Sequence, residues 1–318
     1  MGWEVYRWVW RLEGPLHLGL APAGMLNRTR LYVPARTLLG ALTAELTRRR
    51  ALATGQAPSP QDYEKESGDL KERVRLTYLF PAQETGGRWL AWLPQYREGK
   101  GLVWQREDGQ RSATDREFRK WLLTAHVGTA IDPYNDSALE GSLREHEVIQ
   151  PWSHWGEDRE PQRVFLVGFV FLQSGESRLK QVEELALGGD TRYGLGWIRR
   201  VACNRHSGPE LFRDVGVDTQ GEEPLCRSRF LLAHGIGPSG KLRGALEAFG
   251  GWNAGKLQET QIAWEPGSFS GEPLAWRIQP DGLWEKESVQ GEVSLKHLGT
   301  PAPPDPGSKA FDGTCEGV

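Results

Sequence analysis

Residues 163–173 read RVFLVGFVFLQ, and this stretch decides the fold class. Its interior is apolar at every position, without the alternation that a strand with one solvent-exposed face shows. The pattern predicts a strand that is buried on both faces. Such a strand needs neighbouring strands in a sheet and a covering layer on each side, so it indicates the centre of a packed core.

The N-terminal segments supply neighbours for this strand. Residues 3–13, WEVYRWVWRLE, are rich in aromatic and β-branched residues and predict a strand that ends before Gly14-Pro15. Residues 34–50, PARTLLGALTAELTRRR, predict a helix with a leucine stripe and basic residues in its last turn. The remaining expectations on this side are a polar, solvated connection at 53–72, strands at 74–80 and 88–93, and a short helix at 115–124.

On the C-terminal side, residues 177–187, SRLKQVEELAL, predict an amphipathic helix that stops at Gly188-Gly189. Residues 194–203, GLGWIRRVAC, predict a closing strand. The resulting order is strand, helix, strand, strand, helix, strand. This is the βαββαβ order of a ferredoxin-like (RRM-like) domain of the α+β class, with an insertion at about 95–160.

The remaining third of the chain predicts a smaller C-terminal β-rich unit. It contains a strand in RSRFLLAHGI, a short helix in GKLRGALEAFGG, and a hairpin in LAWRIQPDGLW. We therefore expect a first domain at 1–204, a second unit at 205–287, and a disordered tail at 288–318. The tail is expected because apolar residues become sparse there and TPAPPDPGS at 300–308 is rich in proline.

Composition narrows the classes of function. The chain has 318 residues, a net charge of −3 and a sequence pI near 6.2. It is therefore not a basic chain that coats nucleic acid, although a local basic groove remains possible. The three cysteines form no CxxC pair, so we expect no disulfide framework, no metal site and no cofactor. Because no signal peptide or membrane-spanning stretch is evident, we expect a cytoplasmic protein without membrane partners.

The segment most suited to ligand binding is LALGGDTRYGLGWIRR at 185–200. It fails the Walker A pattern because Leu195 occupies the lysine position, and it does not match the GxGxxG fingerprint of dinucleotide-binding folds. A glycine-rich loop can still bind an anion through exposed backbone N–H groups, with charge from Arg192, Arg199 and Arg200. The alternative is that these glycines only cap a helix and allow tight packing.

Three segments resemble the RAMP superfamily of CRISPR-associated proteins. The first is the loop from Gly188 to Gly196, which has the double glycine and the R–G–G pattern before the last strand. The second combines PLHLG at 15–19 with VPARTLLGAL at 33–42, although Ala35 and Leu39 depart from the usual glycine and basic residue. The third is 129–151, whose ALEGSL run is similar to the inserted segment of effector-complex subunits.

The resemblance implies a non-catalytic crRNA-binding subunit of a type III-like CRISPR effector ribonucleoprotein in antiviral defence. Of the groups in the superfamily, it favours the Cas-five-like group, which grips the crRNA 5′ tag. The implied partners are crRNA, other effector subunits and, indirectly, target RNA. The expected RNA-binding residues are Gly188, Gly189, Arg192, Tyr193, Gly194, Gly196, Arg199, Arg200, His17, Asn27, Arg28 and Arg30.

Two catalytic alternatives can be weighed on the residues. Target-cleaving relatives carry an acidic residue in the loop after the first strand, but residues 14–34 contain neither Asp nor Glu. The other alternative is a metal-independent endoribonuclease that processes the crRNA precursor, with His17 as the base. A single histidine without a positioned partner is weak evidence for catalysis, so we expect no enzymatic activity.

Overall fold

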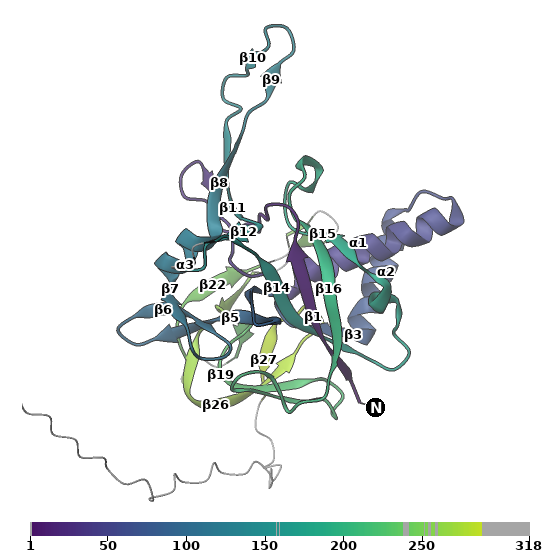
Figure 1. Cartoon of the computed structure of the whole chain (residues 1–318). Helices are drawn as coiled ribbons and strands as arrows, with labels where there is room; N and C mark the ends of the chain where they lie inside the picture. The colour runs from purple at the N-terminus through teal and green to yellow at the C-terminus, as the bar shows by residue number, and fades with distance from the viewer. Residues whose placement is uncertain are drawn as a thin grey trace, which may run out of the picture. The chain divides into compact units, whose positions relative to one another are not determined.

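Strand β14 (Phe165–Leu172) is the central strand of the first sheet, and all of its residues are buried. It pairs antiparallel with β1 (Glu4–Leu12) on one side and with β3 (Val74–Leu76) and β4 (Phe80–Thr85) on the other. The prediction of a strand buried on both faces is confirmed. The computed structural model that shows this (Figure 1) describes residues 2–156, 158, 160–237, 242–250, 252–253, 256–257 and 260–287.

The first sheet extends from this centre in both directions. Strand β1 also pairs antiparallel with β16 (Trp197–His206), so the central order is β16-β1-β14-β3. In the described part of the chain the remaining strands of this sheet are β3 (Val74–Leu76), β4 (Phe80–Thr85), β5 (Arg88–Arg97), β6 (Gly101–Arg106), β7 (Ser112–Thr114) and β15 (Glu184–Ala186). The strands predicted at 3–13, 74–80, 88–93 and 194–203 are therefore present, with shifted ends.

Helix α1 (Ala35–Thr54) confirms the helix predicted from its leucine stripe, because Leu38, Leu39, Leu42 and Leu46 are buried. The prediction of a solvated connection at 53–72 is wrong: helix α2 (Pro60–Arg73) occupies most of it. Pro60 sits in the first turn, where its missing N–H costs nothing, and Ser59 forms a capping box with Asp62. A third helix, α3 (Asp115–Leu122), begins with a similar capping box, and confirms the short helix predicted at 115–124.

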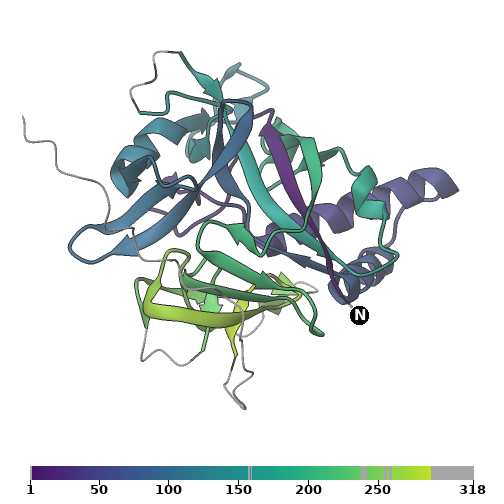
Figure 2. The same ribbon diagram turned by 60° about the horizontal axis from the view of Figure 1, so that its bottom comes forward.

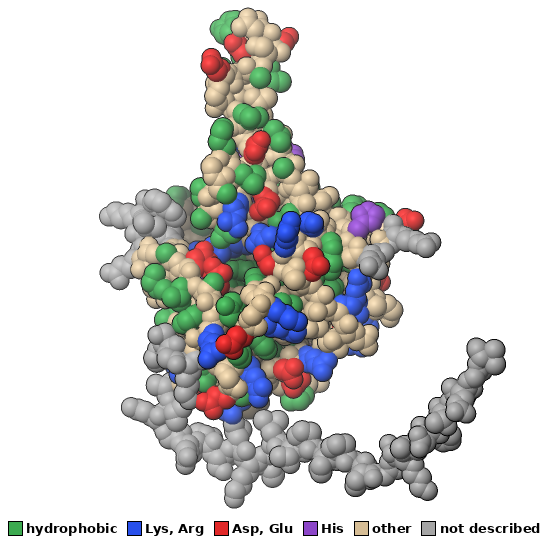
Figure 3. Space-filling view, turned by 90° about the vertical axis from the view of Figure 1, so that its left-hand side faces the viewer, with side chains coloured by type: hydrophobic (Ala, Val, Ile, Leu, Met, Phe, Trp, Pro, Cys, Tyr) green, Lys and Arg blue, Asp and Glu red, His purple; other side chains and the backbone are tan. Residues whose placement is uncertain are grey.

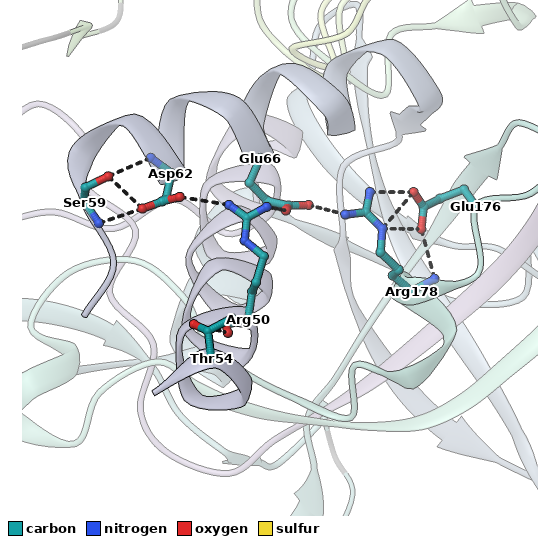
Figure 4. A network of polar contacts seen from close by, with 7 residues as sticks. All are labelled: Arg50, Thr54, Ser59, Asp62, Glu66, Glu176 and Arg178. Carbon is teal, nitrogen blue, oxygen red and sulfur yellow. Dashed lines mark hydrogen bonds and ion pairs between the residues drawn. The ribbon is translucent and has the colours of Figure 1, made fainter. Parts of the chain in front are cut away.

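Helices α1 and α2 are joined to the segment after β14 by a chain of ion pairs (Figure 4). Glu66 on α2 is almost wholly buried, and Arg178 donates to its carboxylate over 2.7 Å. Arg178 also binds the buried carboxylate of Glu176, while Arg50 on α1 binds Asp62 over 3.1 Å and lies 3.9 Å from Glu66. Two buried carboxylates thus share one arginine, which fixes α2 against this segment.

The amphipathic helix predicted at 177–187 is wrong. Residues Arg178–Gln181 form a single 3₁₀ turn (η1), and the chain continues as the short strand β15, which pairs with β16. The apolar residues that suggested a helix are buried, namely Leu179, Val182, Leu185 and Leu187. Their spacing fits a turn followed by a strand as well as it fits a helix, because the segment is too short for periodicity to separate the two.

The C-terminal strands form a second sheet, shown green to yellow in Figure 2. The short helix predicted at 240–251 is wrong, because strands occupy its described residues, whereas the hairpin predicted at 274–284 is confirmed. In the described residues the strands of this sheet are β17 (Glu210–Phe212), β18 (Val215–Asp218), β19 (Leu225–Phe230), β20 (Gly235–Ile236), β21 (Leu242–Arg243), β22 (Leu246–Phe249), β25 (Gln261–Trp264), β26 (Phe269–Ile278) and β27 (Trp284–Lys286). A separate pair is formed by β23 (Trp252–Asn253) and β24 (Lys256–Leu257).

The two sheets share one hydrophobic core. Phe212 of the second sheet contacts Phe169 of β14 with ring centroids 5.0 Å apart, and the guanidinium of Arg7 on β1 lies against both rings. The next residue on β1, Trp8, faces the opposite side, where Arg200 lies over its ring. Residues Met1–Glu287 form one compact unit. The predicted boundary at 204/205 falls inside β16, and the change of sheet comes a few residues later, between β16 and β17. A division into two domains stays a prediction. The tail predicted at 288–318 lies outside the described residues.

A long two-stranded arm projects from the first sheet (Figures 1 and 3). It consists of β8 (Leu123–Gly128) and β11 (Arg144–Ile149), and its tip carries the small pair β9 (Ile131–Asp132) and β10 (Ser137–Ala138). Strand β2 (Leu26–Asn27) pairs with β11 at its base, and β12 (Trp152–Ser153) pairs with β13 (Gln162–Arg163) beyond it. The arm and its flanking strands occupy much of the predicted insertion at 95–160.

Candidate nucleic-acid interface

A cleft of about 440 Å³ opens where three segments beside the first sheet meet. These are the loop after β1, the start of α1, and the loop between β15 and β16. Its lining residues are Leu18, Gly19, Arg30, Pro34, Arg36, Thr37, Gly40, Ala41, Ala186, Gly188 and Gly189. Three of the predicted site residues, Arg30, Gly188 and Gly189, are therefore brought together here.

The glycine loop enters this cleft from β15 and not from a helix. The helix predicted at 177–187 would have placed the negative end of its dipole beside a phosphate bound to this loop, and that repulsion does not arise. Gly188 has a φ of 77°, and a Cβ there would lie 2.1 Å from the carbonyl oxygen of His17. The N–H of Gly189 donates to the same carbonyl over 3.0 Å. Only glycine fits at 188, and the close contact locks the loop to the segment after β1.

At the far end of the loop, some of the other predicted residues serve packing and others are exposed to solvent. Gly196 serves packing, because a Cβ there would lie 1.9 Å from the carbonyl oxygen of Leu187. At Gly194 nothing lies within 4 Å of a Cβ, although its φ is 86°. Between Asp190 and Gly194, the short 3₁₀ turn η2 (Thr191–Tyr193) presents Arg192 and Tyr193 to solvent, with Tyr193 71% exposed. These two side chains are available to a ligand.

The start of α1 adds a residue that the sequence reasoning missed. Pro34 precedes the helix and makes no side-chain cap, and the first turn contains no acidic residue. The first turn instead carries Arg36, which lines the cleft. An arginine at this place opposes the helix dipole, since the N-terminal end favours negative charge. That conflict was visible in the sequence and is a signal of function.

Arg30 lies between this cleft and a smaller one of about 310 Å³, which Arg28 also lines. Both ends of the Arg30 guanidinium bind the carboxylate of Glu247 on β22, one of them over 2.7 Å. Burial raises the pKa of Glu247, but hydrogen bonds from Arg30 and His234 outweigh it and lower that pKa to about 2. The carboxylate is therefore ionised, and the charge of Arg30 is compensated within the protein.

His17, the alternative catalytic residue, is buried and has a structural partner. Its Nδ1 lies 2.8 Å from the carbonyl oxygen of Glu147, to which it donates. Its ring meets the ring of His146 edge to face at 5.0 Å, and Nε2 of His146 lies 3.4 Å from the Asp190 carboxylate. The group ties the base of the arm to the glycine loop.

The remaining predicted residues lie outside the cleft lining. The amide of Asn27 donates to the carbonyl of Glu145 over 3.3 Å, and Arg199 pairs with Glu184 over 2.7 Å. Arg200 donates to the carbonyl of Leu179 over 2.9 Å and is half-buried. Arg200 therefore has a role in holding the η1 segment, while Arg199 remains exposed at the surface.

Within the described part of the chain, no three His, Cys, Asp or Glu side chains gather as metal ligands. The described helices include none with the length and apolar character needed to cross a membrane.

Comparison with family models and with curated proteins gives no match for this chain. Among solved structures, it is similar to a chain of the type III-B Cmr-beta complex bound to cognate target RNA. The identity is 14% and the TM-score 0.49, over 83% of this chain and 86% of that one. A chain of the same complex with target RNA and AMPPnP gives 15% and 0.48 over 83% and 85%. One from its apo state gives 11% and 0.35 over 62% and 96%.

Proposed function

We propose that this chain is a non-catalytic crRNA-binding subunit of a type III-like CRISPR effector ribonucleoprotein, and that the cleft grips the 5′ tag of the guide. The observation that carries the proposal is the meeting of an uncapped helix start, a cationic side chain and a double glycine in one cleft. Each of these features suits a phosphate backbone: free N–H groups, positive charge, and close approach without a Cβ.

Arg192 and Tyr193 extend this surface beyond the cleft. Both are exposed next to the glycine loop, and in the described residues the guanidinium of Arg192 has no carboxylate partner. An arginine can bind phosphate, and an exposed tyrosine ring can stack on an unpaired base. The pairing suits single-stranded RNA better than a duplex, whose bases are not free to stack.

The strand order also supports the proposed family. The strands β16-β1-β14-β3 are antiparallel throughout. We propose that this order derives from a ferredoxin-like domain in which β15 and the η1 turn replace the second helix. The residues that resemble the RAMP superfamily, 15–19, 33–42 and 188–196, meet at the cleft. They thus come together at the site that the proposal needs.

We propose that the tip of the arm binds another protein subunit and not RNA. Residues 129–143 contain Asp132, Asp136 and Glu140 but no Lys or Arg, so a polyanion would be repelled. Apolar side chains are exposed on the same tip, with Ile131 65% and Tyr134 95% accessible. Figure 3 shows hydrophobic and acidic side chains along it. Exposed apolar residues on a projecting element suit a protein partner.

The endoribonuclease alternative is less favoured by the geometry. The buried ring of His17 is engaged with the Glu147 carbonyl, and in the described residues 14–34 there is no carboxylate to assist it. We expect no cleavage of repeat RNA or guide-complementary RNA, with or without Mg²⁺. Cleavage that His17→Ala abolishes would support the alternative.

The central experiment measures the affinity of the purified protein for labelled RNA at several salt concentrations. We expect retention of an RNA with the repeat-derived tag at its 5′ end, and weaker retention when the tag is placed at the 3′ end. Arg36→Ala and Arg192→Ala should each weaken binding and reduce the log–log salt slope by about 0.7, the value for one phosphate contact on a single strand. Arg48→Ala, on the exposed far half of α1, is the matched control and should change neither. Equal slopes for all four proteins would contradict the proposal.

A further inference from the structure

Strand β22 of the second sheet supplies a contact to each of the two arginines that line the cleft. Glu247 in this strand binds Arg30 with both carboxylate oxygens. Phe249, two residues on, lies under the guanidinium of Arg36 at 3.7 Å, and the following carbonyl, of Gly250, accepts a hydrogen bond from it. Both cations of the cleft are thus held by one short strand from the C-terminal part of the chain.

The Arg30 contact is fixed from behind by a chain of buried hydrogen bonds. Nε2 of His234 lies 2.8 Å from the Glu247 carboxylate, and Nδ1 of the same ring lies 2.7 Å from the hydroxyl of Tyr78. The backbone N–H of His234 donates to that hydroxyl oxygen over 3.3 Å. One proton arrangement satisfies every group: the tyrosine O–H donates to Nδ1, and Nε2–H donates to the carboxylate.

This arrangement cancels the charge of Arg30. Both partners are largely buried, with side-chain exposures of 12% for Arg30 and 18% for Glu247, so solvent screens the pair poorly. A carboxylate in contact with a guanidinium offsets its positive potential at any phosphate farther away. A phosphate in the cleft would therefore gain little from Arg30.

Arg36 is held in a different way. Its contacts are an aromatic ring and a carbonyl oxygen, neither of which carries a net charge, and among the described residues it has no ion pair. The ring face attracts the cation and restricts its rotamers without neutralising it. Arg36 thus has no carboxylate in direct contact and is held in a fixed position, which is the condition for binding phosphate with little loss of entropy.

We propose that β22 sets the charge of the cleft: Glu247 neutralises Arg30, and Phe249 positions Arg36 as the cation that binds RNA phosphate. The inference rests on the proposed RNA-binding function. It gives the C-terminal unit a part in the site, and it assigns Glu247 and Phe249 as positioning residues that need not touch RNA.

The decisive variant is Glu247→Gln, which removes the negative charge and keeps oxygen and amide groups of the same shape. We expect several-fold tighter RNA binding and a salt slope steeper by about 0.7, because Arg30 becomes available to one more phosphate. Glu223→Gln is the matched control. Glu223 forms a similar two-oxygen pair with Arg75 of β3, so its loss removes the same charge without freeing a cleft residue, and the slope should stay unchanged.

Two further variants keep the inference testable if Glu247→Gln folds poorly. The double variant Arg30→Gln/Glu247→Gln removes a pair with no net charge, so its salt slope should equal that of the wild type. If Arg30 itself binds phosphate, the double variant instead loses about 0.7 from the slope. Phe249→Leu should weaken binding several-fold with an unchanged slope, because Arg36 keeps its charge but loses its support.

The outcomes separate this inference from the proposed function. If the wild type binds no RNA, both are overturned. If the wild type binds, and Arg192→Ala weakens binding while Glu247→Gln and Phe249→Leu behave like Glu223→Gln, only the role of β22 is overturned. Thermal unfolding of each variant identifies any change that merely reflects loss of folded protein.

Discussion

Two glycines of the loop between β15 and β16, separated only by Leu195, have opposite structural demands. Gly196→Ala places a methyl group against the carbonyl oxygen of Leu187, so we expect severe destabilisation. Gly194→Ala meets no neighbouring atom and suffers only from its positive φ, which costs about 1–2 kcal/mol. Urea unfolding of both variants measures the difference in unfolding free energy. Similar losses for the two would contradict the different environments that we describe.

The buried pair of His234 and Glu247 makes stability depend on pH. Burial lowers the pKa of His234, so unfolding binds a proton and stability falls as the pH drops below about 6.5, the ordinary value. Glu247 has its pKa lowered to about 2, so its contribution is complete above about 4.5 and is lost as the pH falls toward 2.

We therefore expect the melting temperature to fall on acidification from pH 7, with a further fall below pH 4.5. Glu247→Gln should remove much of the fall in melting temperature below pH 4.5 and keep the fall at higher pH. His206 also contributes to the fall at higher pH, because burial lowers its pKa. Melting curves between pH 7 and pH 3 test this. A variant profile parallel to that of the wild type below pH 4.5 would show that Glu247 has no such role.

At the residue scale, the sequence indicated part of the site. Gly188, Gly189 and Arg30 were predicted and do line the cleft. The compensation of Arg30 by Glu247 could not be predicted, because the two residues are 217 positions apart and pairing over such a distance leaves no local pattern. Arg36 was missed although its conflict with the helix dipole is local.

Among the elements, the arm is the one whose shortening should affect binding to other subunits without affecting the stability of the fold. Gly128 and Arg144 face each other across the arm, so residues 129–143 can be replaced by a two-residue Asn-Gly turn. The tip is hydrogen-bonded mainly within itself, so we expect no change in melting temperature and no change in RNA affinity. We expect that the full chain co-purifies with guide RNA and other effector subunits from its host, and that the shortened chain loses protein subunits. Unchanged co-purification would argue against a protein-binding tip.

Elements with a long apolar pattern were predicted, whereas α2 and β15, which depend on a cap and on a distant partner strand, were not. Strand β14 and helix α1 follow directly from continuous and periodic apolar residues. Helix α2 was missed because its composition is polar, although Ser59 and Asp62 form a capping box that the sequence contains. Strand β15 was predicted as helix because its identity depends on pairing with β16, which lies beyond the glycine loop.

For the whole molecule, the shared core predicts that the two sheets cannot be separated. Phe169 and Phe80 of the first sheet both contact Phe212, which lies beyond the predicted boundary at 204/205. A chain shortened to residues 1–206 would expose these rings, so we expect it to aggregate or to bind a hydrophobic dye. Size-exclusion chromatography and dye fluorescence of the shortened chain test this. A soluble monomer with a cooperative melting curve would instead support two independent domains.

The contacts that β22 makes to Arg30 and Arg36 have a consequence for the order of events during translation. Every segment that lines the cleft lies before residue 190, yet the contacts that hold its two arginines come from residues 247–250. While the ribosome is still making the second sheet, Arg30 has no carboxylate and Arg36 no aromatic support. The nascent chain therefore presents two uncompensated cations, which would attract cellular RNA of any sequence. On the proposed function, the cleft would reach its final charge only when β22 has been synthesised and folded into place.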